Sequence, residues 1–236
     1  DGIRGIDVIC GGFPCQDISI AGKGAGIKGE QSGLWVEYKR IINDVRPRFA
    51  IVENVAALLN RGLSVILGDL AEIGFDAVWT TIDSQYCGVP QRRRRVYIVA
   101  FRDGIPSGCD PLQFAHRSAS ECRQQVEHIQ GGREWYFKEG ERVGDCVAFF
   151  TRQRSDEFAC TGLSSTLAKR DYKSFTDLVL RSDGSIRRVI PSERLALQSI
   201  PRDWLDGLDI PTIEQFRMNG MTANVVQYLG GRLMRV

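Results

Sequence analysis

The first hundred residues alternate between short apolar runs and longer amphipathic stretches. A short, mostly apolar stretch at about 6–10 predicts a strand, and a second stretch at 48–53, apolar from 49 to 52, predicts another. Between them, apolar residues at about 33–45 recur at helical spacing and predict a helix that Pro47 ends. The predicted order is therefore strand, helix, strand.

The same alternation continues beyond the second strand. Apolar residues at about 63–73 again have helical spacing, and we expect Gly74 to stop this helix. Two further strands are predicted near 75–83 and 95–101, as an antiparallel pair. Alternating strands and helices are typical of an α/β sheet, so this part of the chain predicts that fold class.

A cysteine follows the first predicted strand and is the first candidate for chemistry. Gly11 and Gly12 are expected to break the strand, and Pro14 stiffens the backbone before Cys15. In open α/β sheets, ligands bind at the carboxyl ends of the strands. A thiol held on a rigid turn there is a candidate covalent nucleophile, whereas the alternative is a small buried core cysteine.

Two charged motifs accompany the other predicted strands. Glu53 closes the second apolar run, and four arginines, 92–95, lead into the strand predicted at 95–101. At the start of a strand their guanidinium groups are expected to converge on one acceptor. The chain thus supplies a thiol, a carboxylate and an arginine cluster, each at the end of a predicted strand.

These motifs resemble, in this order, those of the DNA cytosine-5 methyltransferase family. Residues 12–16 match its nucleophile motif, 53–55 its Glu-Asn-Val motif and 91–95 its Gln-Arg-Arg-x-Arg motif. The resemblance covers about 10–101 and 163–235. It implies a partial Rossmann-like α/β sheet of the S-adenosylmethionine-dependent methyltransferase type, with a small irregular target-recognition region.

The resemblance also implies how the catalytic residues act on cytosine. The Cys15 thiolate would add to carbon 6 of a flipped-out base, and Glu53 would protonate or hydrogen-bond ring nitrogen 3. Arg95 would hold the exocyclic oxygen, and Arg93 would support the pocket. Five other residues, in these motifs or just after the first, are expected to bind the target nucleotide: Phe13, Gln16, Ser19, Asn54 and Gln91.

S-adenosylmethionine is the methyl donor that the resemblance implies. Pro14, Leu34 and Asn219 match positions that contact it in the family. The family's glycine-rich donor turn precedes the nucleophile motif, and Cys15 is only the fifteenth residue here. We therefore expect the N-terminal donor-binding units to be missing.

The resemblance divides the chain into three parts. Residues 1–103 are expected to form the catalytic domain, 104–185 the target-recognition region, and 186–236 a return to the catalytic domain. The middle, at about 102–165, is polar and predicts irregular structure. Near the carboxyl end, 188–201 resembles a motif that supports the recognition region.

Composition restricts the partners and the compartment. The seven cysteines form no Cys-x-x-Cys pair, so no metal is expected. The odd cysteine count without a secretory segment indicates a reducing, cytoplasmic setting, and no apolar run has membrane-spanning length. The resemblance implies that this is the cytoplasm of a bacterial or phage-infected cell. The expected partners are double-stranded DNA and, in addition, a cognate restriction endonuclease or the missing N-terminal segment.

Three alternatives to an active DNA methyltransferase remain open. The first is a tRNA cytosine-5 methyltransferase on the same fold. The second is a non-catalytic nucleic-acid-binding remnant, because the donor-binding units are expected to be absent. The third is one half of a split enzyme, which a second polypeptide would complete.

Overall fold

The computed structural model describes nine parts of the chain, which fall into two compact units. The first unit comprises Asp1–Ile82 and Arg94–Arg117, and the second comprises Asp83–Arg93 and Ser118–Arg235. The described residues are 5–14, 34–105, 146–152, 158–160, 163–167, 177–181, 183–201, 207 and 220–233.

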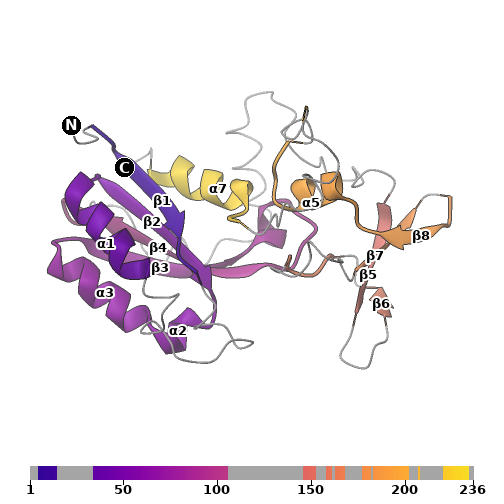
Figure 1. The fold of residues 1–236 in the computed structure, drawn as a ribbon, viewed down its shortest axis with the longest axis horizontal. Coiled ribbons are helices and arrows are strands. Elements are labelled where there is room, and N and C mark those ends of the chain that lie inside the picture. Colours follow the sequence, from indigo (N-terminus) through magenta and orange to yellow (C-terminus); the bar gives the residue numbers. More distant parts are fainter. Residues whose placement is uncertain are drawn as a thin grey trace. The chain divides into compact units, whose positions relative to one another are not determined.

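The first unit contains a four-stranded mixed sheet with the strand order β1-β2-β4-β3 (Figure 1). Strand β1 is parallel to β2, and β4 is antiparallel to β2. At the other edge, the amide of Ser84 donates to the carbonyl of Arg93 (3.1 Å), so β4 turns back beside β3 as predicted. The strands are β1 (Val8–Gly12), β2 (Phe49–Val55), β3 (Asp76–Asp83) and β4 (Arg94–Phe101).

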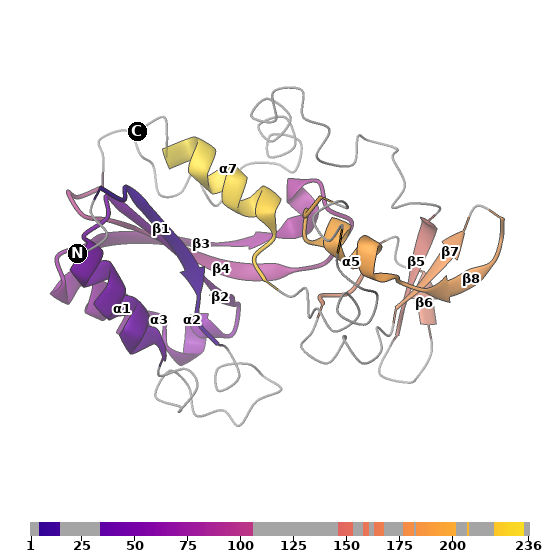
Figure 2. The ribbon, with the colours of Figure 1, turned by 45° about the horizontal axis from the view of Figure 1, so that its top comes forward.

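Helices α1 (Leu34–Val45) and α3 (Leu63–Glu72) lie on one face of this sheet (Figure 2), and the short α2 (Leu58–Arg61) precedes α3. Because side chains alternate along a strand, every second residue of β2 and β4 faces these helices. This shared core confirms the predicted α/β fold and accounts for the amphipathic pattern of both helices. Its fully buried members include Ile42, Ala50, Val52, Leu58, Ile66, Leu70, Val96, Ile98 and Ala100.

Both long helices end where the sequence predicts. Helix α1 stops at Val45, and Arg46 takes a left-handed conformation (φ 52°) directly before Pro47. After α3, Gly74 has φ 79°, and the amide of Phe75 donates to the carbonyl of Leu70 (2.9 Å). This second pattern is a Schellman cap, for which glycine is the favoured residue.

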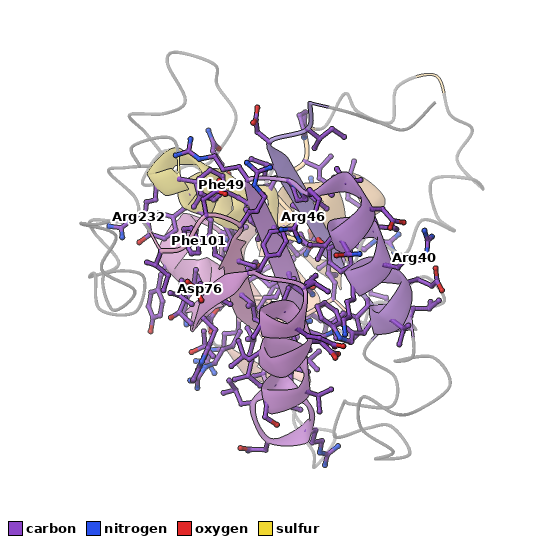
Figure 3. All side chains as sticks on the ribbon, turned by 90° about the vertical axis from the view of Figure 1, so that its left-hand side faces the viewer. Arg40, Arg46, Phe49, Asp76, Phe101 and Arg232 are labelled. Atoms are coloured by element: carbon purple, nitrogen blue, oxygen red, sulfur yellow. The ribbon has the colours of Figure 1, made fainter. Side chains whose placement is uncertain are left out.

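The opposite face of the sheet carries aromatic side chains. Phe49 and Phe101 are directly opposite each other in the β2–β4 register. Their rings meet edge to face, 5.7 Å apart between centroids (Figure 3). A cross-strand aromatic pair of this kind stabilises the register of a sheet by about 0.2–1 kcal/mol.

The prediction that Gly11 and Gly12 break the first strand is wrong. Strand β1 runs to Gly12, and the two glycines pair with Val52 and Glu53 of β2. Glycine adopts extended backbone when a partner strand fixes it, so long-range pairing overrides the local preference. Beside these glycines, the Tyr38 hydroxyl donates to the carbonyl of Ile51 (3.0 Å).

The second unit contains its own antiparallel sheet, with the strand order β6-β5-β7-β8 (Figure 1). Two of its strands lie in the stretch predicted to be irregular, so that prediction is wrong for 146–152 and 158–160. The segment 146–152 is rich in valine, phenylalanine and threonine, which favour strands. The strands are β5 (Cys146–Arg152), β6 (Phe158–Cys160), β7 (Leu178–Arg181) and β8 (Ile186–Arg188).

Three helical segments complete the described part of the second unit: η2 (Ser84–Cys87), α5 (Pro191–Leu197) and α7 (Ala223–Leu233). Pro191 is the first residue of α5, a position that suits proline, and Glu193 accepts a hydrogen bond from the Ile190 amide (3.0 Å). Helix α7 contacts η2 through Asn224, whose side-chain amide donates to the carbonyl of Cys87 (2.9 Å). The predicted division of the chain at 103/104 and 185/186 stays a prediction.

Candidate active site

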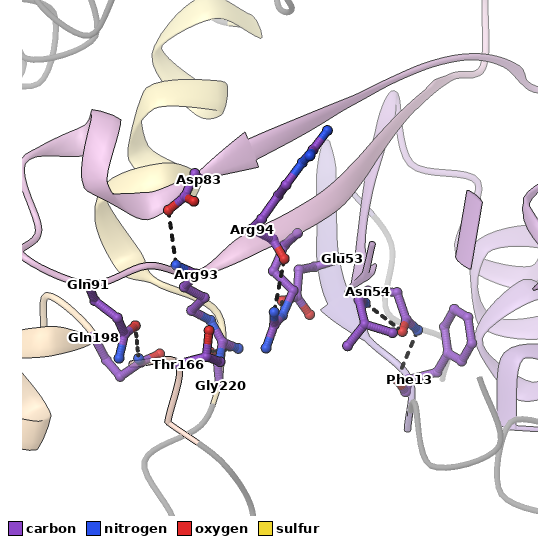
Figure 4. Close-up of polar contacts among 12 residues, drawn as sticks. Phe13, Glu53, Asn54, Asp83, Gln91, Arg93, Arg94, Thr166, Gln198 and Gly220 are labelled. Atoms are coloured by element: carbon purple, nitrogen blue, oxygen red, sulfur yellow. Dashed lines mark hydrogen bonds and ion pairs between the residues drawn. The ribbon is translucent and has the colours of Figure 1, made fainter. Parts of the chain in front are cut away.

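A carboxylate and a guanidinium form an ion pair on the sheet of the first unit. The Nε atom of Arg95 lies 3.2 Å from Oε1 of Glu53, and their side chains are only 14% and 12% exposed (Figure 4). Arg95 is opposite Val55 in the antiparallel register, so it lies on the same face as Glu53. The structure therefore brings together two of the four predicted catalytic residues, in a partly desolvated setting that strengthens their attraction.

The chain leaving β1 is fastened beside this pair. Asn54 is 2% exposed, and its side-chain amide donates to the carbonyl of Phe13 (3.2 Å). The side-chain oxygen of Asn54 accepts from the backbone amide of Val55 (2.8 Å), and this bond fixes the orientation of the Asn54 side chain (Figure 4). The residue after Glu53 thus holds Phe13, and Pro14 follows, directly before the predicted nucleophile Cys15.

Four predicted site residues lie outside the described part of the chain. They are the nucleophile Cys15, the predicted nucleotide contacts Gln16 and Ser19, and the predicted donor contact Asn219.

The expectation that the arginines converge on one acceptor is wrong. Arg95 pairs with Glu53, whereas the exposed Arg94 points to the other side and donates to the Thr81 hydroxyl (3.1 Å). Alternation of side chains along an extended strand separates neighbouring arginines in this way.

Arg93 makes a third, separate contact, within the second unit. This residue is buried, and its Nη2 donates to the carbonyl of Gly220 (2.8 Å), while its amide donates to Asp83 (2.9 Å). These contacts link the turn 83–93 to Gly220 (Figure 4), while the predicted support of the pocket by Arg93 stays a prediction.

Gln91 is fully buried in the second unit. Its side-chain amide donates to the carbonyl of Ser165 (3.1 Å), and its side-chain oxygen accepts from Gln198 (3.1 Å). Both polar ends of the side chain are engaged within the protein, which gives Gln91 a structural role. Its predicted contact with the nucleotide stays a prediction.

Sequence reasoning did not single out the partners of this network. Asp177 is fully buried and accepts from the amide (2.6 Å) and the hydroxyl (2.9 Å) of Ser165. Gln198 lies in 188–201, so the resemblance of that segment to a supporting motif was the available signal. Ser165 and Asp177 carried no comparable signal, because their importance depends on contacts distant in sequence.

Two predicted donor contacts lie at the same end of the first unit. The rings of Phe13 and Trp35 meet with centroids 5.6 Å apart, which brings the neighbouring Pro14 and Leu34 to the carboxyl end of β1. Leu34 is 51% exposed as the first residue of α1. An exposed apolar side chain at this end of the sheet is available to a ligand.

Within the described residues, no group of three or more histidine, cysteine, aspartate or glutamate side chains is placed to hold a metal ion. No helix among those residues has the length and apolar character needed to cross a membrane.

Comparison with known proteins decides the family. The C-5 cytosine-specific DNA methylase family matches residues 1–154 of this chain. The chain belongs to this family. M.NgoBI, a Type II methyltransferase of Neisseria gonorrhoeae, is 35% identical over 94% of the chain and 72% of its own length. M1.ScrFI, a Type II methyltransferase of Lactococcus lactis subsp. cremoris, is 28% identical over 84% of the chain.

The chain spans about half of the length of M1.ScrFI (54%). Among solved structures, the S. pombe Dnmt2 methyltransferase has a TM-score of 0.60 at 16% identity, over 97% of this chain and 78% of that one. A putative DNA modification methyltransferase encoded within a prophage of E. coli has a TM-score of 0.58 at 15% identity, over 98% and 79%. These likenesses confirm the methyltransferase fold.

Proposed function

We propose that the chain carries the catalytic residues of a DNA cytosine-5 methyltransferase that works through a covalent Cys15 adduct. The observation that carries the proposal is the buried Glu53–Arg95 pair, next to the anchored chain that leads into Cys15. Addition to a pyrimidine ring needs a carboxylate, a guanidinium and a thiol, and the sequence supplies the thiol directly after Pro14.

The reaction begins with addition, because carbon 5 of cytosine is a poor nucleophile. The Cys15 thiolate forms a bond to carbon 6, and the electron pair of the 5,6 double bond moves toward carbon 5. Glu53 facilitates this step by protonating or hydrogen-bonding ring nitrogen 3. Carbon 5 would then bond to the methyl group that the donor supplies. A base, such as a water molecule, would remove the proton from carbon 5, and the freed electron pair would restore the double bond and expel the thiolate.

Arg95 has two tasks in this scheme. Its Nε pairs with the Glu53 carboxylate and its Nη1 donates to the carbonyl of Arg94 (2.9 Å), so Nη2 is the group proposed to reach the exocyclic oxygen of the base. Because a stacked duplex hides carbon 6, the target nucleotide is flipped out of the helix. Phe13, Gln16, Ser19, Asn54 and Gln91 remain the residues proposed to surround it.

S-adenosylmethionine supplies the methyl group, activated on a positively charged sulfur. Pro14, Leu34 and Asn219 are the residues proposed to hold it, and the exposed side chain of Leu34 fits contact with a ligand. No metal takes part in this proposal.

Duplex DNA is the proposed substrate because the relatives M.NgoBI and M1.ScrFI are named Type II methyltransferases and the matched family is a DNA methylase. The same relatives make a restriction endonuclease the proposed functional partner. The likeness to S. pombe Dnmt2, at 16% identity, concerns the fold and does not distinguish DNA from tRNA, so a tRNA substrate remains the second candidate.

The decisive experiment uses duplex DNA containing 5-fluorocytosine together with S-adenosylmethionine. Fluorine at carbon 5 cannot leave as a proton does, so the thiolate is not expelled and a denaturant-resistant adduct accumulates. We expect the unaltered chain to form this adduct when it is supplied with a separately expressed N-terminal donor-binding segment, and little or none alone. Cys15→Ser should form none in either case. Cys10→Ser is the matched control, since Cys10 is an exposed free thiol in β1, and it should form the adduct normally.

A second arm of the same experiment replaces the DNA by a folded tRNA carrying 5-fluorocytosine. An adduct with tRNA alone would transfer the proposal to an RNA substrate. An adduct with neither nucleic acid, from a chain shown to be folded, would instead favour a non-catalytic remnant or half of a split enzyme. An adduct that persists in Cys15→Ser would overturn the covalent mechanism proposed here.

A further inference from the structure

The last residue of β1 lies opposite the proposed acid. Gly12 pairs with Glu53 in the parallel register, so both residues face the same side of the sheet. A Cβ atom added to Gly12 would lie 2.9 Å from Oε2 of Glu53 and 3.1 Å from its carbonyl oxygen. Ordinary contacts between such atoms are about 3.5 Å, so the Glu53 carboxylate occupies space that any other residue at position 12 would fill.

The backbone gives no other reason for a glycine here. Gly5, Gly74 and Gly88 have positive φ angles, but Gly12 is not among the glycines in that region. An L-residue can therefore adopt the conformation of Gly12, and the restriction is one of space alone.

Two contacts of Glu53 oppose its displacement. Its Oε1 forms an ion pair with Nε of Arg95 at 3.2 Å, and its backbone is paired on both sides, with Gly12 of β1 and Tyr97 of β4. A side chain at position 12 would thus displace Oε2 and pull the carboxylate out of its arrangement with Arg95.

We propose that Gly12 is a positioning residue, whose missing side chain sets the place of the catalytic Glu53 carboxylate. This inference rests on the proposed function. Gly12 would thus act on the position of Glu53, whereas Phe13 and Pro14 lead in sequence to Cys15.

Gly11 provides a matched control on the same strand. A Cβ added there would meet the end of the Tyr38 ring at 3.2 Å, on the helix-covered face of the sheet, and would not approach Glu53. Gly11→Ala and Gly12→Ala each add one methyl group and remove one glycine from β1. A difference in activity between the two variants therefore reflects the neighbour that the added methyl group meets, Tyr38 or Glu53.

The first test measures release of tritium from carbon 5 of cytosine in duplex DNA, without a methyl donor. Release requires the thiolate to add to carbon 6, carbon 5 to take a proton from water, and the triton and then the thiolate to leave. We expect Gly12→Ala to lower kcat about 10- to 100-fold at an unchanged KM for DNA, because small misplacements of a catalytic group have effects of this size. Gly11→Ala should stay within about threefold.

A compensating variant separates displacement of the carboxylate from general damage. Glu53→Asp withdraws the carboxylate by one methylene group and should slow release in the otherwise unaltered chain. In the double variant with Gly12→Ala, the loss of kcat should be at least about fivefold smaller than the product of the two single losses. The reason is that the shortened side chain no longer meets the methyl group. Independent effects of the two substitutions would overturn the proposal.

A crystal structure of Gly12→Ala tests the same point without activity. We expect Oε2 of Glu53 to move by about 0.5 Å or more, the distance that restores an ordinary contact. An unmoved carboxylate would overturn the role of Gly12, even if the unaltered chain releases tritium. Conversely, a chain that releases none would overturn the proposed function, while the displaced carboxylate would still support the steric role of Gly12.

Discussion

Arg95 contacts Glu53 because of the register between two strands, with Nε 3.2 Å from Oε1. In the β2–β4 pairing, Glu53 is opposite Tyr97 and Arg95 is opposite Val55, so the two charged residues are diagonal neighbours on one face. The pair is therefore positioned by the central strands of the sheet. Groups fixed on strands are held more accurately than groups carried by loops.

This geometry predicts that Arg95→Lys lowers tritium release from carbon 5 of cytosine about 10- to 100-fold. A lysine offers a single point charge and cannot hold the carboxylate while it reaches the base with further donors. Arg94→Lys is the matched control, because Arg94 is exposed and bonds Thr81 on the other side of the strand. Equal losses in both variants would contradict a specific role of the Arg95 guanidinium, because each substitution keeps the positive charge.

The hydrogen bonds of Asn54, which hold the chain shortly before Cys15, give a second prediction. Asn54→Ala removes the donor to the Phe13 carbonyl and the acceptor for the Val55 amide, both at a site that is 2% exposed. Loss of buried hydrogen-bond partners should lower the free energy of unfolding by about 1–3 kcal/mol, measured by urea denaturation. The exposed Asn60, changed to alanine, should alter it by less than about 0.5 kcal/mol. A similar loss in both variants would contradict an anchoring role.

The elements that sequence predicts well here are those with a strong local pattern. Helices α1 and α3 follow from their apolar spacing, and Pro47 and Gly74 mark their ends. Glu53 was placed correctly on a strand because it continues a buried apolar run. In each case the physical cause lies within a few residues of its effect.

The features that sequence reasoning missed depend on distant partners. Gly12 remains in a strand because β2 pairs with it, although locally it reads as a strand breaker. The Arg93 side chain binds a carbonyl 127 positions away, and Gln198 reaches Gln91 across 107 positions. No local pattern encodes such contacts. The sequence therefore led to the expectation that the arginines share one acceptor, whereas Arg93, Arg94 and Arg95 contact three different acceptors.

Alanine in place of Gly68, within α3, and of Gly74, in its cap, should change the free energy of unfolding in opposite directions. Gly74 has φ 79°, so Gly74→Ala should lower the free energy of unfolding by about 1–2 kcal/mol. Gly68 lies within the helix with nothing within 4 Å of an added Cβ, so Gly68→Ala should raise it by about 0.5–1 kcal/mol. Urea denaturation of both variants checks the signs, and a gain at Gly74 would contradict the cap.

Tyr38 predicts how stability changes at alkaline pH. Burial raises the pKa of its phenol well above the ordinary value of 10.0, and the protonated hydroxyl donates to the carbonyl of Ile51. The unfolded chain therefore loses this proton at lower pH than the folded one, so the contribution of Tyr38 is complete below about pH 10 and declines above it. Tyr38→Phe should lower the free energy of unfolding by about 1 kcal/mol at pH 8.5. By pH 11 the unaltered chain should have lost about 1.4 kcal/mol that the variant does not lose, so the difference disappears. Urea denaturation at both pH values measures it, and a constant difference would show that the phenol ionises equally in both states.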